Sequence, residues 1–116
     1  MQQFDVPIIQ KVYDLYRMLF ELQKNIPKVV RYSLWVRIEN TGLELLEGLL
    51  AVGYLLPEQR AIRLTQASVK VDMLRVFLRL SHDIKVIDQK KYIEIQSVID
   101  EIGRMLGGWI KSFKPR

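Results

Sequence analysis

The chain has 116 residues, no cysteine and a net charge of +5, from 18 Lys and Arg against 13 Asp and Glu. A chain of this length is expected to form one domain over residues 1–116. The absence of cysteine excludes disulfides, thiolate catalysis and cysteine-ligated zinc. No stretch approaches the roughly 18 consecutive apolar residues of a membrane helix, and the N-terminus lacks a signal-peptide pattern. We therefore expect a cytoplasmic protein without membrane contact, whose charge favours polyanionic partners.

Four segments repeat apolar residues with the period of an α-helix, and each predicts one helix. The first helix runs from about Val6 to Lys24. It ends before Asn25-Ile26-Pro27, because the residue preceding a proline is displaced from helical geometry. The second helix runs from about Lys28 to Leu55, where Gly53 and Pro57 mark its end.

The third helix starts near Pro57, a residue type that suits a first helical turn, and continues to about Val86. The fourth helix follows Asp88, which is a residue type that caps helix N-termini. Connections this short place consecutive helices side by side in opposite directions. The predicted fold is therefore all-α, an antiparallel up-down-up-down four-helix bundle.

The third predicted helix is apolar on two opposite sides. One stripe contains Ile62, Val69, Met73, Val76 and Leu80, and the other contains Leu64, Ala67, Val71, Leu74 and Leu78. A four-helix bundle buries one face of each helix, so the other face should contact a second copy or another protein. The helical wheel does not decide which stripe faces the core. As interface candidates in a homo-oligomer we take Leu64, Val71, Leu74 and Leu78.

Three further interface candidates lie near the C-terminus. Gly103 and Gly107 are one helical turn apart, where another backbone can approach closely, and Trp109 lies beside them on the apolar side. The alternative interpretation is a last helical turn that frays.

Positive charge is prominent on the third helix. After Glu58 in its first turn, its only carboxylates are Asp72 and Asp83, and most of its cations are expected to lack a local partner. Our candidates for contact with nucleic acid or a protein partner are Lys28, Arg31, Arg63, Lys70, Arg75, Arg79, Arg104 and Lys111. Phosphate contacts carry no sequence information, and no aromatic-rich platform for single strands is evident, so little base specificity is expected. The alternative is a solvated rim of long side chains.

No group of residues indicates catalysis, a metal or a cofactor. Di-iron bundles use Glu-x-x-His, and the single histidine, His82, lacks that setting. Glu39, Glu44 and Glu47 scatter around the second helix and indicate a solvated face or ion pairing. No P-loop, Gly-x-Gly-x-x-Gly or Gly-x-Ser-x-Gly motif is present. We expect no enzyme. The weaker alternative is a ribonuclease of the HEPN class, whose loose R-x(4–6)-H pattern is similar to Arg75 and His82.

Three stretches carry specific motifs: NIPKVVRYSLWVRI (25–38), VDMLRVFLRLSHDIKVI (71–87) and KKYIEIQSVIDEIGRMLGGWIKS (90–112). The most specific parts are Pro-Lys-x-x-Arg-Tyr and Gly-Arg-Met-Leu-Gly-Gly-Trp. Together they resemble the accessory variability determinant (Avd) proteins of diversity-generating retroelements. The four-helix-bundle proteins encoded in ribosomal RNA intervening sequences are similar over fewer of these residues.

The resemblance implies a ring-like homopentamer of basic four-helix bundles that partners a retroelement reverse transcriptase. It also implies binding of template RNA or its cDNA, and support of error-prone cDNA synthesis in mutagenic retrohoming, without catalysis by the chain itself. The alternative is a structural or adaptor bundle of the intervening-sequence type, whose charge only aids solubility.

Overall fold

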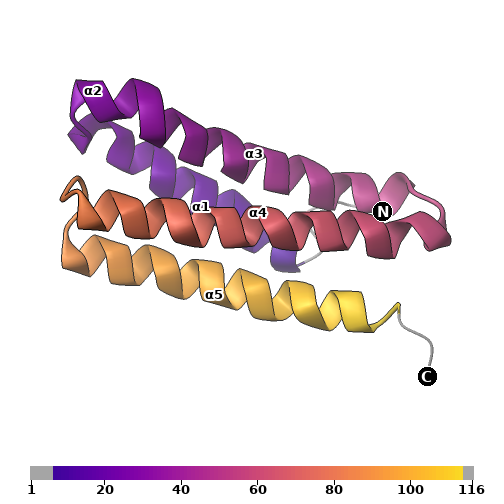
Figure 1. The fold of residues 1–116 in the computed structure, drawn as a ribbon. Coiled ribbons are helices and arrows are strands. Elements are labelled where there is room, and N and C mark those ends of the chain that lie inside the picture. Colours follow the sequence, from indigo (N-terminus) through magenta and orange to yellow (C-terminus); the bar gives the residue numbers. More distant parts are fainter. Residues whose placement is uncertain (1–6, 114–116) are drawn as a thin grey trace.

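Helices account for nearly all of residues 7–113, the part of the chain that this computed structural model describes (Figure 1). The predicted start of the first helix at Val6 lies outside the described residues. In chain order the elements are α1 (Pro7–Leu22), the 3-10 turn η2 (Gln23–Asn25), α2 (Lys28–Val30), the π-helical turn η3 (Arg31–Trp35), α3 (Val36–Ala51), the 3-10 turn η4 (Val52–Tyr54), α4 (Pro57–Asp83) and α5 (Gln89–Lys111).

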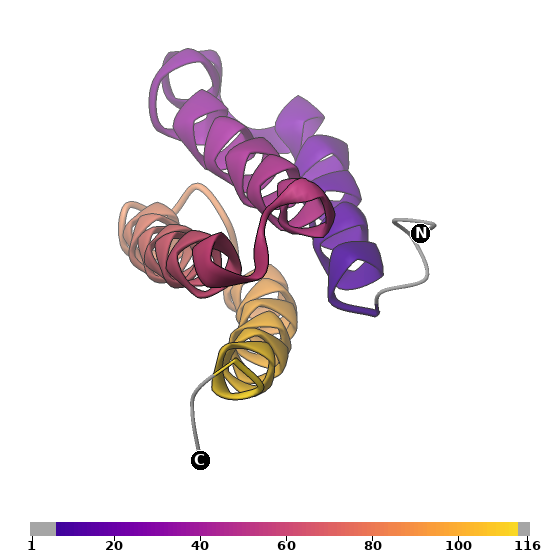
Figure 2. The same cartoon turned by 90° about the vertical axis from the view of Figure 1, so that its right-hand side faces the viewer.

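Four long rods run alternately in opposite directions, with α2, η3 and α3 forming one continuous rod (Figure 1). The view along the bundle shows the rods arranged around a central axis (Figure 2). The α3 rod contacts α1 and α4, and α5 contacts α4 and α1. Helices α1 and α4 therefore lie diagonally opposite each other, and the predicted all-α four-helix fold is confirmed.

Apolar side chains from all four rods fill the space between them. The fully buried ones include Ile9, Val12, Leu15, Leu19, Trp35, Ile38, Leu64, Leu74, Leu78, Ile95, Ile99 and Ile102. They recur every three or four residues, as expected of helices that bury one face. Each large apolar side chain buried in this way contributes about 1.5–3 kcal/mol to folding.

Helix α4 turns its leucine-rich stripe toward this core. Leu64, Leu74 and Leu78 are fully buried and Val71 is nearly so. The prediction that these four residues form the interface between copies is wrong, because their surface is already used inside the chain. The opposite stripe is the exposed one: Ile62 is 64%, Val69 55%, Val76 64% and Leu80 44% exposed.

Local hydrogen bonds and backbone geometry determine where α4 ends and where α5 begins. The Asp88 carboxylate accepts a hydrogen bond from the backbone N–H of Lys91 at 2.8 Å, which confirms the predicted N-cap. Helix α4 ends at Asp83, three residues before the predicted end at Val86. The difference arises because Lys85 adopts a left-handed φ of 66°, and the Val86 N–H turns back to the Ser81 carbonyl at 3.0 Å.

The second rod contains a π-helical turn that apolar periodicity did not predict. A π-turn holds more residues than an α-turn and changes the direction of the side chains that follow. At its end, Trp35 is fully buried and its indole Nε1–H donates to the Leu19 carbonyl of α1 at 3.2 Å. The Ser33 hydroxyl donates to the Val29 carbonyl at 2.7 Å. The last residue of the π-turn thus anchors the second rod to the first.

Candidate functional site

The eight candidate cations lie in several places on the bundle rather than in one patch. Lys28 and Arg31 are at the end where α1 leads into α2. Arg63 and Lys70 line a groove between α3 and α4, and Arg75 lines a small hollow against α5. The remaining candidates, Arg79, Arg104 and Lys111, are exposed on α4 and α5.

Arg75 links α4 to α5. Its Nε lies 3.1 Å from the Asp100 carboxylate of α5, and its Nη1 lies 2.9 Å from Asp72 one turn earlier on α4. A Cβ on Gly103 would lie 2.5 Å from the Arg75 Nη2, so this glycine makes room for the arginine. The expectation that the backbone of another copy approaches Gly103 is wrong, because the Arg75 side chain of the same chain fills the space over this glycine.

The other two C-terminal candidates differ from Gly103. Trp109 is partly buried and packs against the hydrophobic core of its own chain. A Cβ built on Gly107 meets no atom within 4 Å, so the surface there is open. Gly107 therefore stays a candidate for a contact between copies. At least part of the Trp109 ring instead packs against the core of its own bundle.

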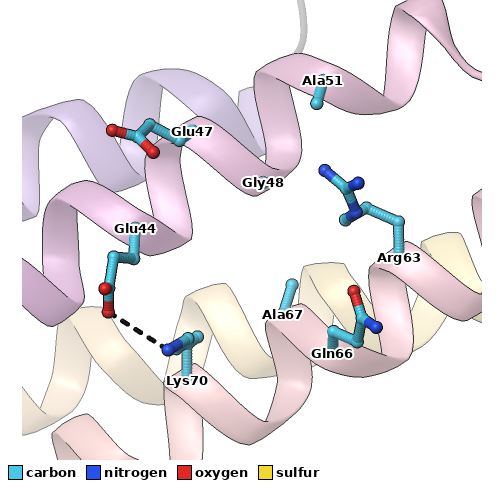
Figure 3. Close-up of a pocket in the computed structure, with 8 residues that line it drawn as sticks. All are labelled: Glu44, Glu47, Gly48, Ala51, Arg63, Gln66, Ala67 and Lys70. Atoms are coloured by element: carbon cyan, nitrogen blue, oxygen red, sulfur yellow. Dashed lines mark hydrogen bonds and ion pairs between the residues drawn. The ribbon is translucent and has the colours of Figure 1, made fainter.

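A groove of about 340 Å³ lies between α3 and α4 (Figure 3). Space remains between the two helices here because Gly48, Ala51 and Ala67 have small side chains or none. The Lys70 Nζ is 3.1 Å from a Glu44 oxygen, and the pair bridges the two helices. The groove's lining residues are Glu44, Glu47, Gly48, Ala51, Arg63, Gln66, Ala67 and Lys70. Because two carboxylates line it with two cations, it does not favour a phosphate.

The expectation that most cations of the third helix lack a partner is wrong. Lys70 and Arg75 form the ion pairs above, and the Arg79 Nε lies 4.0 Å from Asp83. The Arg60 Nε donates to the Leu55 carbonyl at 3.1 Å. Within residues 7–113, Arg60, Arg63 and Lys85 are the α4-region cations without an ion pair, and of these Arg60 has the carbonyl of Leu55 as its partner.

Arg31 holds the connection between α1 and α2. The side chain is half-buried, and its Nη2 donates to the Ile26 carbonyl at 3.0 Å. Its Nε is buried without a hydrogen-bond partner among the described residues. Arg31 therefore positions the turn that carries Lys28 and offers less of its charge to a ligand than an exposed arginine would.

A buried carboxylate lies where a solvated face was expected. Glu39 is only 5% exposed, and the Gln23 amide donates to both of its oxygens at 3.1 and 3.2 Å. Burial raises the pKa of the Glu39 carboxyl above its ordinary value, and the hydrogen bond from Gln23 lowers it by less. Its position one turn after Trp35, on the inward side of the helix, was the available sequence signal.

Glu39→Gln is expected to raise the melting temperature at pH 7. A carboxyl whose pKa is raised by folding destabilises the folded state when ionised, and this penalty disappears as the pH falls through the raised pKa and below the ordinary glutamate pKa. The stabilisation by the substitution should therefore shrink as the pH is lowered, as followed by circular dichroism. Glu47→Gln, at an exposed position on the same helix, is the control and should change little. A lower melting temperature for Glu39→Gln at pH 7 would contradict this account.

His82 and Arg75, the pair of the ribonuclease alternative, are engaged with different neighbours. The His82 ring stacks on Tyr92 with centroids 4.6 Å apart, and its Nδ1 lies 3.7 Å from Asp83. The Arg75 guanidinium is held by Asp72 and Asp100.

In the described part of the chain, no group of three or more His, Asp and Glu residues could hold a metal ion. No helix in this part is long and apolar enough to span a membrane.

The fold and these surfaces define a basic four-helix-bundle protein with one apolar helix face exposed. The family model of bAvd-like proteins matches residues 6–113, so the chain belongs to that family, the bacterial Avd proteins of diversity-generating retroelements. The resemblance drawn from the sequence motifs is confirmed. Membership implies an accessory role in such a retroelement. A comparison with curated proteins finds no significant match.

Proposed function

We propose that this chain is a noncatalytic accessory protein that binds nucleic acid and partners the reverse transcriptase of its retroelement in error-prone cDNA synthesis. The family match over residues 6–113 is the observation that carries the proposal. The net charge of +5 supports a polyanionic ligand such as template RNA or cDNA. The scattered arrangement of the cations supports contacts to phosphates rather than to base edges, and hence little base specificity.

We further propose that the domain, residues 1–116, assembles with copies of itself, as a ring-like pentamer by family resemblance. The exposed stripe of α4 supports self-association. Ile62, Val69 and Val76 are seven residues apart, so they lie along one line on the side of α4 that faces away from the core. In a ring of five, the net charge would sum to about +25, and many weak phosphate contacts would act together.

Fluorescence anisotropy with labelled single-stranded RNA and DNA over a salt series tests nucleic-acid binding. We expect binding at low salt, with the logarithm of the association constant falling linearly with the logarithm of the salt concentration. RNA and DNA should bind similarly, and the RNA should stay intact in the presence of divalent metal ions. Absence of binding at low salt would favour the adaptor alternative, and RNA cleavage abolished by His82→Ala would favour the ribonuclease.

A further inference from the structure

Four exposed lysines lie at one end of the bundle, which we call the lysine end. Lys24 and Lys28 flank the connection from α1 to α2, and Lys85 and Lys90 flank the connection from α4 to α5. Both connections lie at the same end of the bundle, on the left in Figure 1. Within residues 7–113, none of the four lysines forms an ion pair.

Most carboxylates at the lysine end are already engaged. Asp83 pairs with Arg79, Asp88 caps α5, and Glu94 lies 3.5 Å from the Lys91 Nζ. Glu21, Asp88 and the buried Glu39, which is hydrogen-bonded to Gln23, are the nearby carboxylates of the described chain without an ion pair. The four lysines and Arg31, all without an ion pair, outnumber these three carboxylates and leave a local excess of positive charge that a polyanion can neutralise.

The opposite half of the bundle is more nearly balanced. Its cations without an ion pair, in the part of the chain that the structure describes, are Arg60, Arg63, Arg104 and Lys111, and its carboxylates without an ion pair include Asp14, Glu47 and Glu58. The excess positive charge is thus concentrated at the lysine end, although the sequence distributes cations over the whole chain.

The two connections meet across the end of the bundle. A groove of about 400 Å³ between the end of α1 and the start of α5 is lined by Lys24 and Lys91, but also by Glu21 and Glu94, so the groove itself does not favour a phosphate and the lysines around it carry the excess charge. The first turns of the second rod, which begins at Lys28, expose Tyr32 to 68% and Val29 to 81%. An exposed aromatic ring four residues after Lys28 on the same rod is suited to a strand with unpaired bases, because the ring can stack on a base while the ammonium groups at this end contact phosphates.

We propose that the lysine end binds single-stranded nucleic acid, with phosphates on Lys24, Lys28, Lys85 and Lys90 and an unpaired base stacked on Tyr32. This inference rests on the proposed function. It adds which surface of the bundle binds nucleic acid and that the bound nucleic acid is single-stranded. A base inside a duplex cannot reach the Tyr32 ring, so the stacking contact selects single strands without selecting a base. Arg31 acts here as a positioning residue, since it holds the turn that carries Lys28.

The test compares two variants that each lose four positive charges. The first is Lys24→Gln/Lys28→Gln/Lys85→Gln/Lys90→Gln. The matched control is Arg17→Gln/Arg63→Gln/Arg104→Gln/Lys111→Gln, which removes four cations that form no ion pair within the described chain and lie outside the lysine end. Anisotropy with a labelled single-stranded RNA of uridines is measured over a salt series, with light scattering and circular dichroism to verify assembly and helicity.

We expect the lysine-end variant to lose at least about tenfold in affinity and its salt dependence to become shallower by up to about 3 in slope. The control variant should retain most of its affinity. Tyr32→Leu should weaken binding to the single strand by about fivefold or more, whereas Tyr32→Phe should not, and binding to a duplex should be insensitive to both.

The outcomes separate this inference from the proposed function. No binding by the wild-type protein at low salt would overturn both. If the wild-type protein binds and the two charge variants lose equal affinity, the proposal that the lysine end is the binding surface is overturned, but the proposed function is not. Insensitivity to Tyr32→Leu would overturn the stacking contact and the preference for single strands. Unchanged RNA binding by the lysine-end variant, together with loss of co-elution with the reverse transcriptase, would assign this surface to the protein partner instead.

Discussion

Trp35→Ala is expected to lower the free energy of unfolding by about 3–5 kcal/mol. The ring is fully buried where the first two rods meet, and its removal leaves a large cavity that the rigid helices can only partly fill. The substitution also removes the hydrogen bond from the indole to the Leu19 carbonyl. Urea denaturation followed by circular dichroism, at one fixed protomer concentration, measures the loss.

Trp35→Phe separates the two causes of this loss. It keeps most of the apolar ring and removes the donor, so the Leu19 carbonyl loses its partner at a cost of about 1–3 kcal/mol. The phenylalanine variant should therefore lie between the wild type and Trp35→Ala. A loss below about 1 kcal/mol for Trp35→Ala would contradict the anchoring role of this residue.

Val69→Asp/Val76→Asp is expected to reduce the mass in light scattering from that of an oligomer to the 13.7 kDa of one chain. Both valines lie on the exposed stripe of α4, and a carboxylate placed in an apolar contact between copies would lose hydration without gaining a partner. Helicity should be unchanged, because neither side chain belongs to the core. Weaker nucleic-acid binding should accompany dissociation, since avidity is lost.

Ile93→Asp is the matched control for this variant. Ile93 is 55% exposed, as Val69 is, but lies on α5 away from the stripe. Its substitution should leave the mass of the oligomer unchanged. A wild-type mass of one chain at micromolar concentration, or an undiminished mass of the Val69→Asp/Val76→Asp variant, would contradict the proposed interface.

The helices and their ends were largely predictable, because the sequence marks them locally. Pro27 and Pro57 separate the first three rods, and Asp88 caps the fourth. The direction in which α4 faces was not predictable. Its two stripes are both apolar with helical spacing, and the choice depends on where α3 and α5 pack.

The ion-pair partners of individual charged residues could not be predicted either, because they also depend on how the helices pack. Arg75 and Asp100 are 25 residues apart, and their ion pair depends on the register of two antiparallel helices. The π-turn that ends at Trp35 likewise leaves no signal in apolar periodicity, although it contains the residue that anchors the second rod to the first. The lysine end brings together two connections that are distant in the sequence, so the local excess of charge emerges only in the fold.

The accessory role is tested most directly by measuring cDNA synthesis on the template RNA by the retroelement's reverse transcriptase, with and without this protein. The account predicts that full-length, mutated cDNA accumulates only when the protein is present, and that the protein co-elutes with the enzyme and the RNA. Equal amounts of cDNA with equal error frequency in both reactions would contradict it.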